Sequence, residues 1–165
     1  MCNNSEKGRK GELAATAIFS TIGVHERNIE VIRANKTNTP EGGVDIELEC
    51  PHNLSAKLDD IAANGRSDIA LSNSTIPVRA QVKNYTRPIN KSTMQGFVDD
   101  IDKNSEFAEH WGIGGTKLTK GAQEVLAGAR SKAVVKWYTA QDVDKIQSQY
   151  PQIPFSKIND NGERE

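Results

Sequence analysis

Two segments of the chain alternate apolar with polar residues at every second position. The first is residues 44–49 (VDIELE) and the second is residues 78–83 (VRAQVK). A period of two sends successive side chains to opposite faces of a β-strand. We therefore predict two strands, each with one buried face and one polar face. Acidic side chains share the polar face of the first strand, and Gln81 and Lys83 share that of the second.

Other segments place apolar residues three or four positions apart, which is the spacing of an amphipathic helix. The first such segment, residues 8–22, predicts a helix that ends near Gly23. Four more helices are predicted over residues 54–64, 91–103, 119–129 and 140–149. Ser92 is the expected N-cap of the helix over residues 91–103.

Shorter apolar runs between these segments predict the remaining strands, over residues 28–33, 67–71, 112–116 and 133–138. A polar loop is expected over residues 35–43. A helix, a meander of strands and then alternating helices and strands predict a mixed α/β domain whose central sheet is covered by helices on both faces. Trp111 and Trp137 fall in predicted core elements and are expected to be structural.

The chain has 165 residues, of which 36% are hydrophobic and 26% charged. This length and composition predict one folded domain over residues 1–150, and the polar residues 151–165 are expected to form a flexible tail. The polar start and the lack of a long apolar run favour a cytoplasmic protein without a membrane segment. Cys2 and Cys50 do not form a disulfide framework, and no second Cys/His pair completes a zinc site.

The formal net charge is -1 and the pI is near 6.3, which argues against binding nucleic acid through bulk charge. The charges are nevertheless segregated. Residues 41–71 hold seven acidic and two basic side chains, whereas residues 72–98 hold four basic and no acidic ones. Charge alone fits a solvated surface with complementary patches, so it does not decide the function.

Asp45, Gln81 and Lys83 are the residues most suited to chemistry. Neighbouring strands would bring a carboxylate, an amide oxygen and an ammonium group to one polar face. Mg²⁺ prefers oxygen ligands, keeps several waters, and makes a bound water more acidic. Half-exposed strands without any catalytic role have the same alternation, so the pattern alone leaves both interpretations open.

The order of these motifs resembles the restriction-endonuclease-like, or PD-(D/E)xK, nuclease superfamily. Glu12 lies on the first helix, residues 42–46 read GGVDI, residues 77–83 read PVRAQVK, and a helix follows. The closest likeness is to the branch of the Mrr restriction proteins and archaeal Holliday-junction resolvases, in which Gln often replaces the second acid of the signature. Gln81-Val82-Lys83 matches that variant, and the similarity covers roughly residues 7–146.

The resemblance implies a metal-dependent DNA endonuclease on a restriction-endonuclease-like fold. Asp45 and Gln81 would be ligands of Mg²⁺, for which Mn²⁺ can substitute. Lys83 would serve the attacking water, and Glu12 would help to hold the metal or its waters. Glu47 shares the face of Asp45 and is a further candidate, with a solvated strand residue as the simpler interpretation. A homodimer is implied, because each chain has one active site and DNA has two strands.

One departure from the family pattern leaves the acid open. About thirty-five residues separate Asp45 from Gln81, so residues 51–66 are interpreted as an insertion. Asp68, thirteen positions before Gln81, is the rival acid. We prefer Asp45 because Gly-Gly-Val-Asp-Ile fits the Mrr-like pattern more closely.

In this interpretation, the basic and polar residues that follow the strand of Gln81 and Lys83 would bind DNA. Lys and Arg contacts to phosphates supply most of the sequence-independent affinity for DNA. The candidates are Arg87, Lys91, Ser92 and Thr93. Because Gln81 brings no charge to a metal site, a non-catalytic DNA-binding or assembly module on the same fold is the alternative. An enzyme acting on a small phosphorylated substrate is a weaker third.

Overall fold

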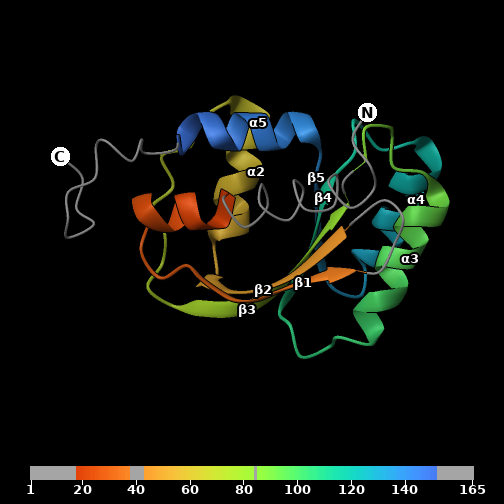
Figure 1. Ribbon diagram of the computed structural model, residues 1–165, viewed down its shortest axis with the longest axis horizontal. Coiled ribbons are helices and arrows are strands. Elements are labelled where there is room, and N and C mark those ends of the chain that lie inside the picture. Colours follow the sequence, from red (N-terminus) through yellow and green to blue (C-terminus); the bar gives the residue numbers. More distant parts are fainter. Residues whose placement is uncertain (1–17, 38–42, 84, 152–165) are drawn as a thin grey trace.

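The computed structural model describes residues 18–37, 43–83 and 85–151. Its centre is a five-stranded mixed sheet with the strand order β1-β2-β3-β4-β5 (Figure 1). The strands are β1 (Glu30–Thr37), β2 (Gly43–Pro51), β3 (Thr75–Lys83), β4 (Glu109–Gly114) and β5 (Val134–Tyr138). β1, β2 and β3 are antiparallel neighbours, whereas β4 runs parallel to β3 and β5 parallel to β4.

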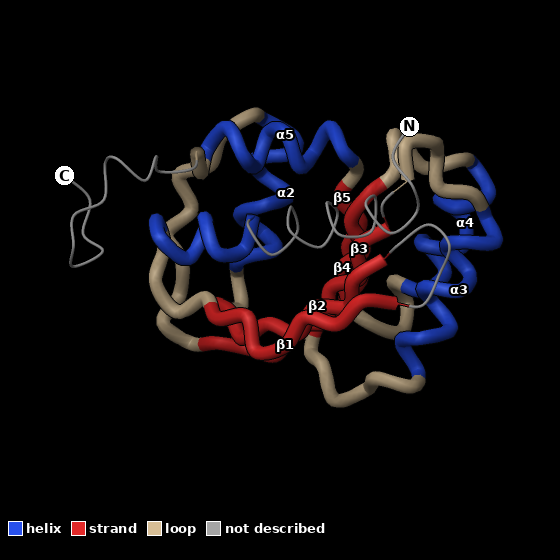
Figure 2. The backbone as a smooth tube through the Cα atoms, viewed as in Figure 1, coloured by secondary structure: helices blue, strands red, loops and turns tan. Residues whose placement is uncertain are grey.

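Helices flank this sheet on both sides, which confirms the predicted mixed α/β architecture (Figure 2). The labelled helices are α2 (Leu54–Asn64), α3 (Lys91–Asp102), α4 (Lys120–Ala129) and α5 (Ala140–Gln149). Residues 18–25 are also helical and pack with α2 and α5 on one face of the sheet. α3 and α4 pack together on the other face. Among the described residues, no helix is both long and apolar enough to cross a bilayer.

Each face of the sheet therefore has its own hydrophobic core. The alternating apolar residues of β2 and β3 lie in the core under α2, where Val44, Ile46 and Leu48 are at most 1% exposed. Trp111 belongs to the same core and Trp137 to the core under α3 and α4, so both tryptophans are buried as predicted. The polar residues of β2 and β3 are left on the α3 side, because a strand sends alternate side chains to opposite faces.

Several predicted boundaries are wrong in ways that have local causes. β1 runs on to Thr37, inside the expected loop, because its later residues continue to pair with β2. β4 begins at Glu109 and ends at Gly114, so it starts three residues earlier than predicted. α3 is capped by Asn90, whose side-chain oxygen accepts a hydrogen bond from the Thr93 amide at 2.9 Å, and Ser92 lies inside the helix.

Residues 67–71 do not form the predicted strand. They run as a loop beside α2, and their backbone groups bond to side chains rather than to a neighbouring strand. The Ser67 amide donates to Gln149 at 2.9 Å, and the Ile69 carbonyl accepts from Lys57 at 2.7 Å. The predicted first helix is seen only from residue 18, continues past Gly23 to residue 25, and otherwise lies outside the described residues.

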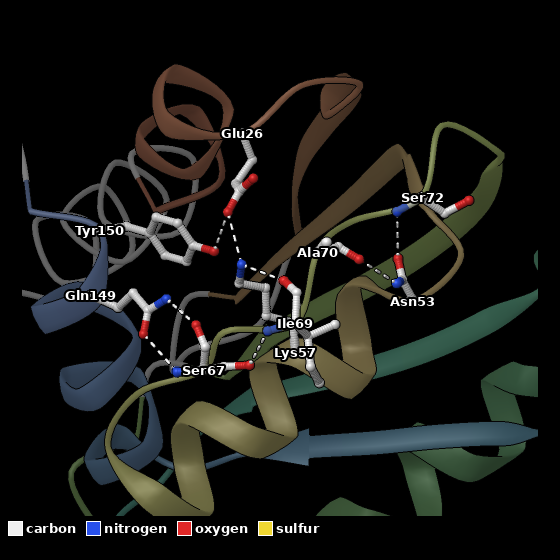
Figure 3. Close-up of polar contacts among 9 residues, drawn as sticks. All are labelled: Glu26, Asn53, Lys57, Ser67, Ile69, Ala70, Ser72, Gln149 and Tyr150. Atoms are coloured by element: carbon white, nitrogen blue, oxygen red, sulfur yellow. Dashed lines mark hydrogen bonds and ion pairs between the residues drawn. The ribbon is translucent and has the colours of Figure 1, made fainter.

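A buried lysine holds this loop, α2 and the segment after residue 25 together (Figure 3). The Lys57 ammonium donates to Glu26 at 3.0 Å and to the Ile69 carbonyl, and the Tyr150 hydroxyl donates to the same Glu26 oxygen at 2.9 Å. Lys57 is 7% exposed, so its charge is stabilised by these partners rather than by water. Residues 51–66, interpreted as an insertion, thus contain a helix that is tied into the core.

Lys57→Ala should lower the free energy of unfolding by about 2 kcal/mol, because it leaves partly buried acceptors without their donor. Urea denaturation measures this loss. Arg66→Ala is the matched control, since the Arg66–Asp68 pair has side chains 77% and 87% exposed and its loss should cost less than about 0.5 kcal/mol. Equal losses in the two variants would contradict the role given to Lys57.

Candidate functional site

The pairing of β2 with β3 places Asp45 directly opposite Gln81. Lys83 lies two residues further along β3, so its side chain leaves the same face of the sheet. The structure thus brings together the three residues that the sequence singled out, at the end of the meander where β3 leads into α3.

Asp45 lies among several charged groups. Its carboxylate forms an ion pair with the Arg79 guanidinium at 3.3 Å, and the Arg79 side chain is 11% exposed. Burial raises the pKa of Asp45, and the nearby charges of Asp100 and Glu47 act in the same direction. Arg79 and Lys83 lower this pKa, yet the net direction is upward. Desolvation, together with the two neighbouring acids, therefore outweighs the attraction of the two cations.

Gln81 is almost fully enclosed, with 3% of its surface exposed. Its side-chain nitrogen donates a hydrogen bond to the Asp100 carboxylate at 3.1 Å. Asp100 lies in the last turn of α3 and was not among the residues that the sequence indicated. Its signal was its position three residues after Phe97, at the edge of the apolar stripe of α3, but this does not show which strand the helix covers.

Two glycines of β4 fix the surroundings of Gln81 and Lys83. Gly112 is the register partner of Gln81, and a Cβ there would lie 2.0 Å from the Trp137 ring. The absence of a side chain lets Trp137 cover the strand and pack edge-on against Phe97 of α3, with ring centroids 5.1 Å apart. This packing sets the height of α3 above the sheet, and hence the reach of Asp100 to Gln81.

Gly114 has a different constraint. It is the register partner of Lys83 and has φ 128°, and a Cβ there would lie 1.9 Å from the Lys83 carbonyl oxygen. Only glycine fits this conformation and this close approach. The end of β4 can therefore lie against the backbone that carries Lys83.

His110 lies on β4, on the side of β3 away from β2 and Asp45. It is the register partner of Arg79 and is 3% exposed. Burial lowers the pKa of His110, and the Arg79 charge lowers it further. A neutral imidazole next to Arg79 leaves the guanidinium directed toward Asp45 without a competing cation from β4.

Three further candidates remain: Glu12, Glu47 and Asp68. Glu12 lies outside the described residues. Glu47 shares the polar face, pairs in register with Arg79, and is 3.8 Å from the Arg33 guanidinium. Asp68 lies in the loop before β3 with an exposed side chain next to Arg66. The residue opposite Gln81 is thus Asp45 and not Asp68.

The candidate DNA contacts lie just after β3. Lys91 and Ser92 are exposed in the first turn of α3, whereas Thr93 is partly buried beside the Asn90 cap. The Arg87 guanidinium carbon is 4.7 Å from the centre of the Tyr85 ring, an arrangement typical of a cation-π contact. All four residues therefore belong to the connection and the first turn that follow Lys83.

The donor set suits a hard cation better than zinc. Within the described ranges, no group of three or more His, Cys, Asp or Glu side chains is arranged to hold a metal ion. Asp45 and the Gln81 amide offer oxygen atoms, and Mg²⁺ is commonly held by one or two carboxylates with waters completing the shell. Asp45 and Gln81 therefore offer two oxygen atoms of the kind that Mg²⁺ or Mn²⁺ prefers.

The raised pKa of Asp45 has a measurable consequence for stability. The folded protein binds this proton more tightly than the unfolded chain, so stability falls as the pH rises above the ordinary value of 3.8 and through the folded pKa. Asp45→Asn should thus raise the melting temperature relative to wild type at pH 7.5, and by less at pH 4. Thermal unfolding at both pH values measures this difference. Asp99→Asn controls for the lost charge, and a larger gain at pH 4 would contradict the assignment.

Comparison with known proteins does not assign roles to these residues. No model of a protein family matches the chain, and no curated protein matches it. Asp45, Gln81 and Lys83 are therefore interpreted from their own geometry and chemistry. The ordinary rules of cation coordination and phosphate chemistry form the basis of the function proposed below.

Proposed function

We propose that this protein is a Mg²⁺-dependent endonuclease that hydrolyses phosphodiester bonds of DNA. The observation that carries the proposal is the register pair of Asp45 and Gln81, with Lys83 on the same face of β3. A carboxylate, an amide and an ammonium group lie on one face of the central strands, near the end of β3. This is the donor set from which a hydrolytic site with a hard cation is built.

The arrangement of elements supports the restriction-endonuclease-like fold that the motifs suggested. Gly-Val-Asp-Ile opens β2, Pro-Val-Arg-Ala-Gln-Val-Lys closes β3, and α3 follows. These segments are neighbours in space as well as in the chain, because β2 and β3 pair along their full nine residues. Residues 51–66, which contain α2, account for the long separation between the two motifs without disturbing this pairing.

Each residue has a distinct part in the proposed reaction. Asp45 and the Gln81 amide oxygen would hold the cation. The cation, when bound, would polarise the scissile phosphate and make its water more acidic. Lys83 carries a positive charge on the same face, where it orients the attacking water and offsets the negative charge that develops on the phosphate oxygens. The partly buried position of Asp45 strengthens these electrostatic effects.

The surface beside the site suits a phosphate backbone. Lys91 and Ser92 are exposed in the first turn of α3, where backbone amides and the helix dipole favour an anion. Arg87 lies in the connection that leads to them. We propose that these groups, with Thr93, bind backbone phosphates, and that two copies of the chain act on the two strands of duplex or branched DNA.

A second candidate, a non-catalytic DNA-binding module on the same fold, has an observation in its favour. The Gln81 nitrogen already bonds Asp100, and Arg79 already neutralises Asp45. Without a cation, the polar groups of Gln81, Asp100, Asp45 and Arg79 already have partners within the protein. Metal binding and cleavage distinguish the two candidates.

Lys83→Ala should reduce metal-dependent cleavage by about 100-fold or more, because it removes a charge that acts in the transition state. The substrates are supercoiled plasmid, methylated plasmid and a synthetic four-way junction, each with Mg²⁺ or Mn²⁺. Arg66→Ala removes a positive charge from an exposed position beside α2, on the opposite face of the sheet, and should cleave as wild type does. Asp45→Ala should lose activity as Lys83→Ala does.

Full metal-dependent activity of either Lys83→Ala or Asp45→Ala would show that the roles are wrongly assigned. A wild-type protein that binds DNA in a salt-sensitive manner, yet cleaves none of the substrates and binds neither Mg²⁺ nor Mn²⁺, would support the non-catalytic module.

A further inference from the structure

The charges around Asp45 do not balance for a divalent cation if only the predicted residues are counted. Asp45 and Glu47 contribute two negative charges, and Arg79 and Lys83 contribute two positive charges. A cation with charge +2 would then enter a region that has no net negative charge. Such a site needs a further carboxylate, because hard cations are held by oxygen ligands that also offset their charge.

Asp100 is placed to supply that charge. Its carboxylate accepts the hydrogen bond from Gln81 at 3.1 Å, and its charge is close enough to Asp45 to act on that carboxyl group. The two acids come from different elements, β2 and α3, and Gln81 lies at the contact with both, as register partner of one and hydrogen-bond donor to the other.

Asp100 lies in the last turn of α3, at the negative end of the helix dipole. The turn itself contains no basic residue, and the exposed Lys103 follows it as the C-cap. In the described part of the chain, no lysine or arginine forms an ion pair with it. A positive charge bound near Asp100 would therefore also interact favourably with this end of the helix.

We propose that Asp100 is the second carboxylate of the cation site and binds Mg²⁺ or Mn²⁺ together with Asp45. The inference rests on the proposed function, because it names a further ligand of the same site. Gln81 has two parts in it: its nitrogen positions Asp100, and its oxygen remains available as a ligand, since an amide donates and accepts through different atoms.

This assignment also gives a reason for an amide at position 81. A carboxylate there would stand 3.1 Å from the Asp100 oxygen and repel it, as like charges do at this separation. Glutamine instead donates to Asp100 and keeps an oxygen. The negative charge that the cation needs is then provided by β2 and α3 rather than by β3.

The direct test is Mn²⁺ binding to the full chain without DNA, measured by calorimetry and by the electron paramagnetic resonance signal of free Mn²⁺. Asp100→Asn should weaken binding by about tenfold or more, as should Asp45→Asn. Asp99→Asn is the matched control, since it removes the same charge from the neighbouring, exposed position of the same helix. Its affinity should stay within about twofold of wild type, because the charge is solvated there.

A double variant that exchanges the amide at position 81 and the carboxylate at position 100 controls for misfolding of the single variant. In the double variant Gln81→Glu with Asp100→Asn, the hydrogen bond persists with donor and acceptor reversed, and the carboxylate is moved to β3. This variant should recover Mn²⁺ affinity to within about threefold of wild type, because the site again holds two carboxylates. A purely structural role for Asp100 would give no such recovery of metal binding.

The outcomes separate this inference from the proposed function. If Asp45→Asn loses Mn²⁺ while Asp100→Asn binds it as Asp99→Asn does, Asp100 is not a ligand and the proposed site stands without it. If wild type binds no Mn²⁺, or Asp45→Asn binds it as wild type does, the cation site itself is overturned. Failure of the exchanged variant to recover binding, with its fold intact by circular dichroism, would also overturn the role of Asp100.

Discussion

The register between β2 and β3 is the constraint on which the rest of the structure depends. Nine consecutive residue pairs join the strands, from Gly43 with Lys83 to Pro51 with Thr75. Because side chains alternate between faces, a slip of one residue would send the apolar set to the α3 side and the charged set into the core under α2. The apolar residues on one face therefore fix the position of the polar residues on the other. Asp45 stands opposite Gln81 because Val44 and Ile46 must be buried.

The two faces of the sheet contribute to different properties of the protein. The side with α2 and α5 contains the larger core and the Lys57 network, which ties the loop before β3 to the body of the protein. The side with α3 and α4 contains the smaller core, and this core determines where α3 lies over β3. Packing of Phe97 against Trp137 thus helps to position α3 over the site, whereas the Lys57 network stabilises the fold from the opposite face.

Much of this architecture follows from sequence periodicity, and the failures have a common cause. The bounds of α2 match the predicted helix, because Leu54, Leu58 and Ile61 recur at helical spacing and are buried on one side. The predicted strand at residues 67–71 fails because its polar backbone groups find Lys57 and Gln149, which are distant in sequence. Asp100 is missed for the same reason. Periodicity shows which face of an element is buried but not which other element packs against that face. A contact between α3 and β3 therefore cannot be predicted from it.

Gly112 and Trp137 have a consequence for how sequences of this fold can diverge. Any side chain at position 112 would enter the space that the indole ring occupies, since even a Cβ would lie 2.0 Å from it. A larger residue at one position therefore requires a smaller one at the other. A smaller residue at position 137 would in turn leave Phe97 without its edge-on partner. The three positions are expected to vary together among homologues, and this coupling would appear as covariation between β4, β5 and α3.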